Sequence, residues 1–130
     1  MARITKTGGV VSACVWDHEN CASSLLWQGA RAIDPMAPGE AEQPGTKRGD
    51  LARLFRLAGM QPDADSVLSV NHEFATFEDL WEPFTLGVGR AGGYVAGLGR
   101  PTRQRLQGRV PGPDSRRPVC AHPSSVGSTR

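Results

Sequence analysis

The chain has few of the residues that mark secreted or membrane-bound proteins. It contains only three cysteines in 130 residues, and this odd, sparse set argues against the disulfide framework of a small secreted domain. No stretch approaches the roughly 18 apolar residues of a membrane-spanning helix, and Met1 is not followed by the hydrophobic core of a signal peptide. We therefore expect a cytoplasmic protein that makes no membrane contact.

The cysteines and histidines are also too few and too irregularly spaced for a common zinc site. Cys14, His18 and Cys21 lie close in the sequence, but their spacing matches no common zinc pattern. Cys120 and His122 lie in a segment with no regular pattern. We predict no metal site.

Acidic residues are scarce in the last quarter of the chain. Residues 1–98 contain 8 basic and 12 acidic residues, whereas residues 99–130 contain 7 arginines and only Asp114 as an acid. The second segment has no apolar period, so it cannot bury enough surface to offset its chain entropy. We predict one domain over residues 1–98 and a disordered, basic tail over residues 99–130. Because the tail has no aromatic residue for base stacking, nucleic-acid binding is disfavoured.

The strongest apolar run lies near the N-terminus, at residues 10–16. Its apolar side chains occupy odd and even positions alike, which is typical of a central parallel strand buried on both faces. Asp17 and His18 follow at the carboxyl end of this strand, where open α/β sheets bind ligands. They are the candidate catalytic residues, with a general base as the role. The alternative is a solvated turn that caps the next helix.

Three helices and a second strand are predicted downstream. Apolar residues recur at helical spacing over residues 22–33, 51–58 and 77–84, and they alternate as in a strand over residues 64–74. Residues 87–92 match G-x-G-x-x-G, but they follow a predicted helix, so a mobile loop is preferred to a dinucleotide site. The aromatic face of the helix at 77–84 is either core or a lid over a small-molecule pocket.

This ordered set of motifs resembles the C-terminal half of class I S-adenosylmethionine-dependent methyltransferases, in particular the small bacterial type 11 group. Three stretches carry the resemblance, which covers residues 1–98: the Gly8-Gly9 strand that ends in Val-Trp-Asp, the helix Asp50 to Gly59, and Phe77-Glu78-Asp79-Leu80-Trp81 with the glycine loop before Tyr94. It implies an α/β fold, the C-terminal half of a Rossmann-like sheet with about two strands and three helices.

The resemblance also implies a function, which is methyl transfer to a small-molecule acceptor with S-adenosylmethionine as cofactor. The implied substrate-binding residues are Trp16, Trp81, Phe84 and Tyr94. The family builds its cofactor site on a glycine-rich turn after the first strand, and nothing here matches it, so we expect no cofactor-binding residue and leave enzymatic activity open. The family has a further helix and a final antiparallel strand after the position of Leu98; we expect neither, and a shifted reading frame would account for the tail.

Two other functions are compatible with the sequence. The chain is alternatively a non-catalytic fragment that associates, with itself or a partner, through an exposed central strand. A basic-tailed nucleic-acid binder is the other alternative.

Overall fold

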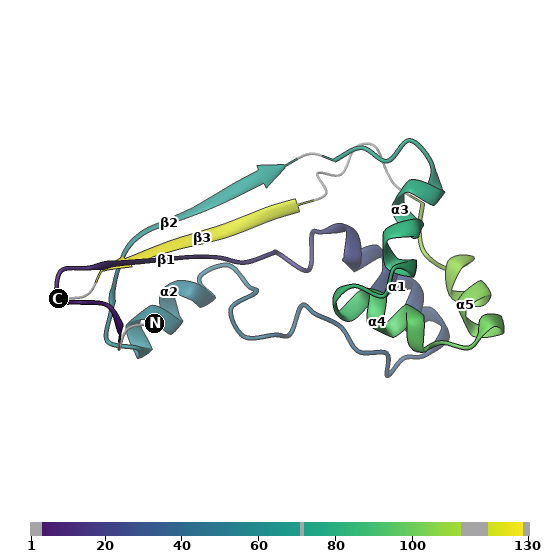
Figure 1. Ribbon diagram of the computed structural model, residues 1–130, viewed down its shortest axis with the longest axis horizontal. Coiled ribbons are helices and arrows are strands. Elements are labelled where there is room, and N and C mark those ends of the chain that lie inside the picture. Colours follow the sequence, from purple (N-terminus) through teal and green to yellow (C-terminus); the bar gives the residue numbers. More distant parts are fainter. Residues whose placement is uncertain (1–3, 71, 113–119, 129–130) are drawn as a thin grey trace.

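The computed structural model describes residues 4–70, 72–112 and 120–128 (Figure 1). In chain order its elements are β1 (Val10–Cys14), α1 (Ala22–Ile33), α2 (Asp50–Leu57), β2 (Gln61–Val70), α3 (Phe77–Thr85), α4 (Gly89–Gly97), α5 (Arg100–Gln107) and β3 (Cys120–Ser128). The chain is therefore a mixed α/β protein, as the sequence predicts.

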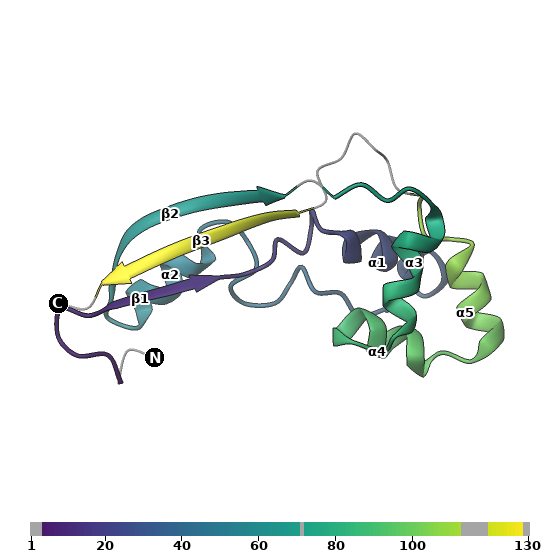
Figure 2. The same ribbon diagram turned by 45° about the horizontal axis from the view of Figure 1, so that its top comes forward.

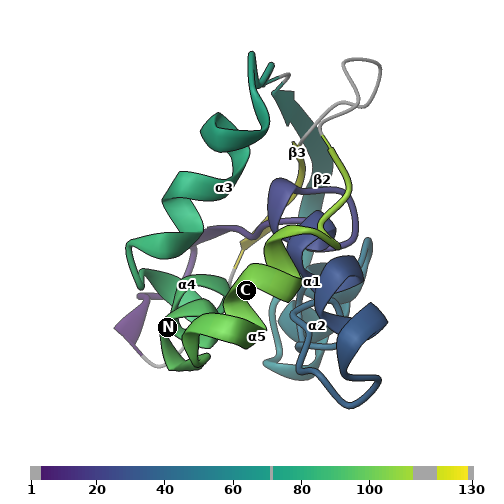
Figure 3. The same ribbon diagram turned by 90° about the vertical axis from the view of Figure 1, so that its right-hand side faces the viewer.

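The molecule is elongated, with a sheet at one end and a group of helices at the other. Figure 2 shows α2 lying against one face of the three strands, and Figure 3 shows α1, α3, α4 and α5 grouped together at the opposite end. Within that group α3 packs on α4, and α1 packs on both α4 and α5. None of the helices in the described ranges is long and apolar enough to cross a membrane.

The sheet has the strand order β1-β3-β2, and both pairs are antiparallel. The backbone of Ser128 in β3 lies opposite Val10 on one side and Gln61 on the other. Two strands that are each antiparallel to β3 run parallel to one another, so β1 and β2 share a direction on either side of it.

The prediction of a central, doubly buried parallel strand at residues 10–16 is wrong. β1 is an edge strand of the described sheet, with Val11 6% exposed and Val10 62% exposed. The physical reason is that only one face is covered: Val11 packs with Phe55 of α2 and with Met60 in a small cluster. An apolar run in the sequence shows which side chains can be buried. It does not show whether a second layer of the structure covers them.

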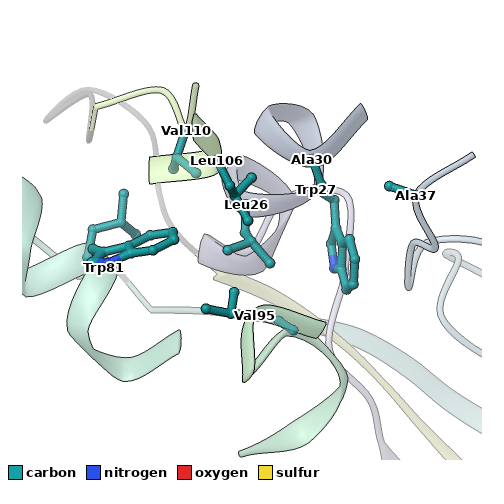
Figure 4. Close-up of a cluster of buried hydrophobic side chains, with 10 residues drawn as sticks. Leu26, Trp27, Ala30, Ala37, Trp81, Val95, Leu106 and Val110 are labelled. Atoms are coloured by element: carbon teal, nitrogen blue, oxygen red, sulfur yellow. The ribbon is translucent and has the colours of Figure 1, made fainter. Parts of the chain in front are cut away.

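The main core lies in the helical end (Figure 4). Its fully buried side chains come from four helices, and they are Leu26 of α1, Leu80 of α3, Val95 of α4 and Leu106 of α5. The predicted apolar face of α1 packs on this core only in part: Leu26 is fully buried, but Trp27 and Ala30, which the predicted face did not include, are buried as well. A Cβ at Gly29 would lie 2.9 Å from the backbone nitrogen of Val110, so the absence of a side chain lets the segment after α5 approach α1 closely.

The prediction of disorder throughout residues 99–130 is also wrong. Residues 100–107 form α5, and residues 120–128 form β3, so a helix and an antiparallel strand do follow Leu98. Hydrophobic periodicity does not predict α5, because the helix has only one buried apolar side chain, Leu106, among arginines and glutamines. Val110 adds a second contact just beyond the helix. The rest of that prediction, at residues 113–119 and 129–130, falls outside the described residues.

Candidate functional site

A polar hollow of about 300 Å³ lies along α1, from Ser24 in its first turn to Arg31 in its last. Three segments form its walls: the turn between β1 and α1, the exposed side of α1, and the loop after α1. The lining residues are His18, Glu19, Ser24, Trp27, Gln28, Arg31, Glu40, Ala41 and Glu42. Because α1 carries its apolar face into the core, its polar residues Ser24, Gln28 and Arg31 are left to line the hollow.

Glu40 is the most unusual residue of this hollow, because this acidic residue is only 9% exposed and its side chain only 11%. Its Oε2 accepts a 2.9 Å hydrogen bond from the buried indole Nε1–H of Trp27. The same oxygen lies 3.7 Å from Nδ1 of His18. A carboxylate removed from water needs such partners, since burial without them is costly.

Cys21 also lies near His18, at the N-cap position of α1. Its Sγ is 3.9 Å from Nδ1 of His18 and 3.0 Å from the hydroxyl of Ser23. Glu40 and Cys21 thus approach the same imidazole nitrogen. A nucleophilic relay requires the base to contact the nucleophile with one nitrogen and the orienting acid with the other, so the three residues do not form one.

No group of three or more potential metal ligands is arranged to hold a metal ion within residues 4–70, 72–112 and 120–128. Cys14 is exposed on β1, whereas Cys21 is buried beside α1. The cysteines that lie close in the sequence are therefore in different environments.

Of the two candidate catalytic residues, only His18 lines the hollow. The carboxylate of Asp17 accepts hydrogen bonds from the backbone N–H of Glu19 at 3.0 Å and from the side-chain amide of Asn20 at 2.8 Å. These contacts fold the turn that leads into α1. Asp17 therefore has the turn-forming role that the sequence left open as the alternative, and it positions the backbone next to His18.

The four aromatic residues implied as substrate-binding lie in different places. Trp81 is buried in the core and stacks on Phe77 with ring centroids 6.2 Å apart, and Phe84 packs against the same core. Trp16 is about half exposed, at 51%, and does not line the hollow. Trp81 and Phe84 therefore belong to the helical core, and none of the three residues lines the hollow.

Tyr94 is the aromatic residue that comes nearest to the hollow, through Trp27. The two rings are tilted at 50° with centroids 5.2 Å apart. Burial raises the pKa of the Tyr94 phenol above its ordinary value, and the negative charge of Asp34 adds to this effect. Tyr94 therefore supports the indole that holds Glu40.

Sequence reasoning missed Glu40 and Arg31 as site residues. Glu40 lies in a loop rich in proline and glycine, where no periodicity exists to assign a buried position. Arg31 lies on the polar face of a predicted helix, where the sequence cannot distinguish it from an ordinary solvated arginine. The one available signal was Trp27, whose indole N–H requires a partner when it is buried.

The glycine motif at residues 87–92 does not form a cofactor cradle. The prediction of a mobile loop is wrong, because Gly89 to Gly92 form the first turn of α4. The motif follows α3, so a helix and not a strand precedes it. A Cβ at Gly92 would lie 2.9 Å from the carbonyl carbon of Gly87, which means that the backbone of the motif itself fills the space inside the turn. The described residues therefore do not fit the glycine-rich turn on which the methyltransferase resemblance would place S-adenosylmethionine.

Comparisons with protein-family models, with curated proteins and with solved structures find no match to this chain.

Proposed function

We propose that this chain is the acceptor-binding part of an S-adenosylmethionine-dependent methyltransferase resembling the type 11 group. The observation that carries the proposal is the position of the hollow. The chain leaves the carboxyl end of β1 and enters the hollow within a few residues, at His18. Ligands of α/β proteins bind outside the carboxyl ends of the strands.

The order of elements after Leu98 also supports the proposal. The resemblance implies a helix and then a final antiparallel strand. α5 and β3 stand in that order, and β3 is antiparallel to both of its neighbours. β1 and β2 then run in the same direction, as successive strands of a Rossmann-like sheet do.

His18 is the residue that would act on an acceptor in the hollow. Its Nδ1 lies 3.7 Å from Oε2 of Glu40 and 3.9 Å from Sγ of Cys21, so both contacts orient the same edge of the ring. An oriented imidazole beside a carboxylate can accept a proton from a hydroxyl or amine.

The test is a calorimetric titration with S-adenosylmethionine in two samples. One sample is the purified chain, and the other is the chain mixed with a separately produced N-terminal half of a type 11 methyltransferase, which carries the glycine-rich turn. We expect no saturable binding by the chain or by the half alone, and saturable binding by the mixture. Absence of binding in the mixture contradicts the proposal, and saturable binding by the chain alone contradicts the assignment of the cofactor site to the other half.

A second candidate function, self-association, is favoured by the free side of β2. No strand of the described part lies beside β2 on the side away from β3, and three of its apolar side chains are exposed: Val67, Leu68 and Val70. An exposed strand edge of this kind is a template for pairing. The sequence predicted association through an exposed central strand at residues 10–16. Because β1 is an edge strand, the hypothesis now concerns the exposed edge of β2.

A second copy is the partner that fits this edge. Antiparallel pairing of β2 with itself, centred between residues 66 and 67, places Asp65 opposite Leu68 and Asp63 opposite Val70, so that no two carboxylates face each other. Light scattering coupled to gel filtration should show a mass that rises with protein concentration. Leu68→Lys should remove the rise, whereas Leu57→Lys, at an exposed position of α2, should keep it. A constant monomer mass for the unaltered chain would exclude this function.

A further inference from the structure

We infer that the hollow beside α1 binds a small organic cation, such as a primary ammonium compound, with Glu40 as its anionic anchor. The inference rests on the proposed function for the identification of the hollow as the acceptor site, and it names the class of acceptor. Its evidence is the charge, burial and hydrogen bonding of the lining residues.

The hollow carries more negative than positive charge. Three carboxylates line it, those of Glu19, Glu40 and Glu42, against the single guanidinium of Arg31. Lys47 pairs with Glu42 at 3.1 Å on the exposed rim, and this contact raises the pKa of Lys47. The rim therefore already holds one ammonium group against a carboxylate.

Arg31 does not neutralise the buried carboxylate. It forms no ion pair with Glu40 or with any other acid of the described part of the chain. Its guanidinium instead lies where a side chain on Gly39 would be, so glycine at that position makes room for it. The carboxylate of Glu40 thus lies at the wall of the hollow without an arginine or lysine partner.

The second carboxylate oxygen of Glu40 is the atom offered to a ligand. Oε2 receives the Trp27 N–H and faces His18, whereas Oε1 takes no hydrogen bond from the described residues and is not sealed from solvent. A carboxylate held by a fixed indole donor on one oxygen is preorganised to accept from a ligand on the other. An ammonium group supplies both the charge and the N–H donors that this oxygen lacks.

The size of the hollow limits the ligand. A volume of about 300 Å³ lies at the lower end of the range for small-molecule sites. The buried indole of Trp27 also lines the hollow, beside the carboxylate that its N–H holds. The geometry thus favours a compact amine over a nucleotide or a peptide.

The test compares three probes of one length: butylammonium, butyrate and the zwitterion 4-aminobutyrate. Binding to the purified chain is followed by calorimetry and by the indole N–H resonance of Trp27 in NMR spectra, assigned with Trp27→Phe. We expect butylammonium to move this resonance saturably and butyrate to leave it unchanged. Equal or tighter binding of butyrate would overturn the inference and indicate an anion site formed by Arg31. Tightest binding of 4-aminobutyrate would also overturn it, because the preferred ligand would then be a zwitterion and not a simple cation.

Two variants test the anchor. Glu40→Gln keeps an oxygen for the Trp27 N–H but removes the charge, and it should weaken butylammonium binding by about tenfold or more, as expected for loss of a hydrogen bond to a charged group. Glu82→Gln, on the exposed side of α3, should leave binding unchanged. Arg31→Gln should keep or increase the affinity for butylammonium. This variant tests the inference even if Glu40→Gln does not fold. A loss of butylammonium binding in Arg31→Gln would contradict the inference. Because none of these measurements uses S-adenosylmethionine, their failure is distinguishable from failure of the proposed function.

Discussion

The indole Nε1–H of Trp27 and the Oε2 of Glu40 lie 2.9 Å apart, and this hydrogen bond ties the proline- and glycine-rich loop to α1. Both residues are buried, so the contact links the core directly to the wall of the hollow. Stability and ligand binding therefore depend on the same pair.

Glu40→Ala is expected to destabilise the fold by about 1–3 kcal/mol, because it leaves the buried Trp27 N–H without an acceptor. The matched control is Glu42→Ala, which breaks only the exposed ion pair with Lys47 and should destabilise the fold much less, because solvent screens that pair. Urea unfolding followed by circular dichroism measures both. Equal losses in the two variants would show that the buried hydrogen bond adds nothing.

Leu106→Ala tests whether the arginine-rich segment is part of the folded unit. Leu106 is fully buried in the helical core, so its truncation should lower the free energy of unfolding by about 2–5 kcal/mol. Leu57→Ala, at an exposed position of α2, should change it by no more than about 0.5 kcal/mol. If Leu106→Ala unfolds at the urea concentration of the unaltered chain, α5 is not docked as described.

Gly29→Ala and Gly93→Ala should have opposite effects, although both glycines lie within helices. A Cβ at Gly29 would meet the backbone of residues 109 and 110 at 2.9–3.0 Å, so overpacking should cost about 1–3 kcal/mol. At Gly93 no atom lies within 4 Å of the added carbon, and the higher helix propensity of alanine should stabilise the chain by up to about 1 kcal/mol. Thermal unfolding compares the two, and a stabilising Gly29→Ala would contradict the close approach of the segment after α5.

Thr76→Ala should destabilise α3 through loss of its N-terminal capping box. The Thr76 hydroxyl accepts from the backbone N–H of Asp79 at 3.1 Å, and the Asp79 carboxylate accepts from the backbone N–H of Thr76 at 2.8 Å. Loss of such a cap costs about 1 kcal/mol. Thr85→Ala, near the other end of the helix, is the control and should stay within about 0.5 kcal/mol. A cost no greater than that of Thr85→Ala would mean that the box does not hold the helix end.

Tyr94 is the sole tyrosine, so its ionisation can be followed by ultraviolet absorbance. Burial raises its pKa in the folded state, and the phenolate should therefore form at higher pH in the native chain than in urea. The folded state then holds its proton longer than the unfolded state, so this contribution to stability is present below about pH 10 and is lost as the pH rises further. The raised pKa of Lys47 acts in the same direction, and Tyr94→Phe should remove only part of the alkaline loss. Identical absorbance midpoints in the native and unfolded chain would contradict the burial of the phenol.

Local elements of this chain follow from local chemistry and were predictable. The apolar stripes of residues 22–33, 51–58 and 77–84 predict α1, α2 and α3, which form close to those bounds. The capping role of Thr76 and the left-handed turn at Gly59, with φ of +75°, also follow from residue type alone. Such features depend on interactions within a few residues, which the sequence displays directly.

The candidate site was only partly predictable. His18 was found because it follows an apolar strand, but its partner Glu40 is 22 residues further on and lies in a loop without any pattern. Trp81 and Phe84 were implied as substrate-binding by the resemblance, whereas the structure places them in the helical core. An aromatic side chain fits a core and a pocket equally well, and only the packing of neighbouring helices decides between them.

By itself the sequence determined the α/β class and the positions of α1, α2 and α3, because these follow from residue spacing. Tertiary structure alone decided that β1 is an edge strand, that β3 lies between β1 and β2, and that α5 docks through Leu106. It also decided that the carboxylate of Glu40 is buried against Trp27. Each of these outcomes depends on which distant segment covers a given surface, and that choice is made by burial free energy summed over the whole chain, not by the local pattern of any segment.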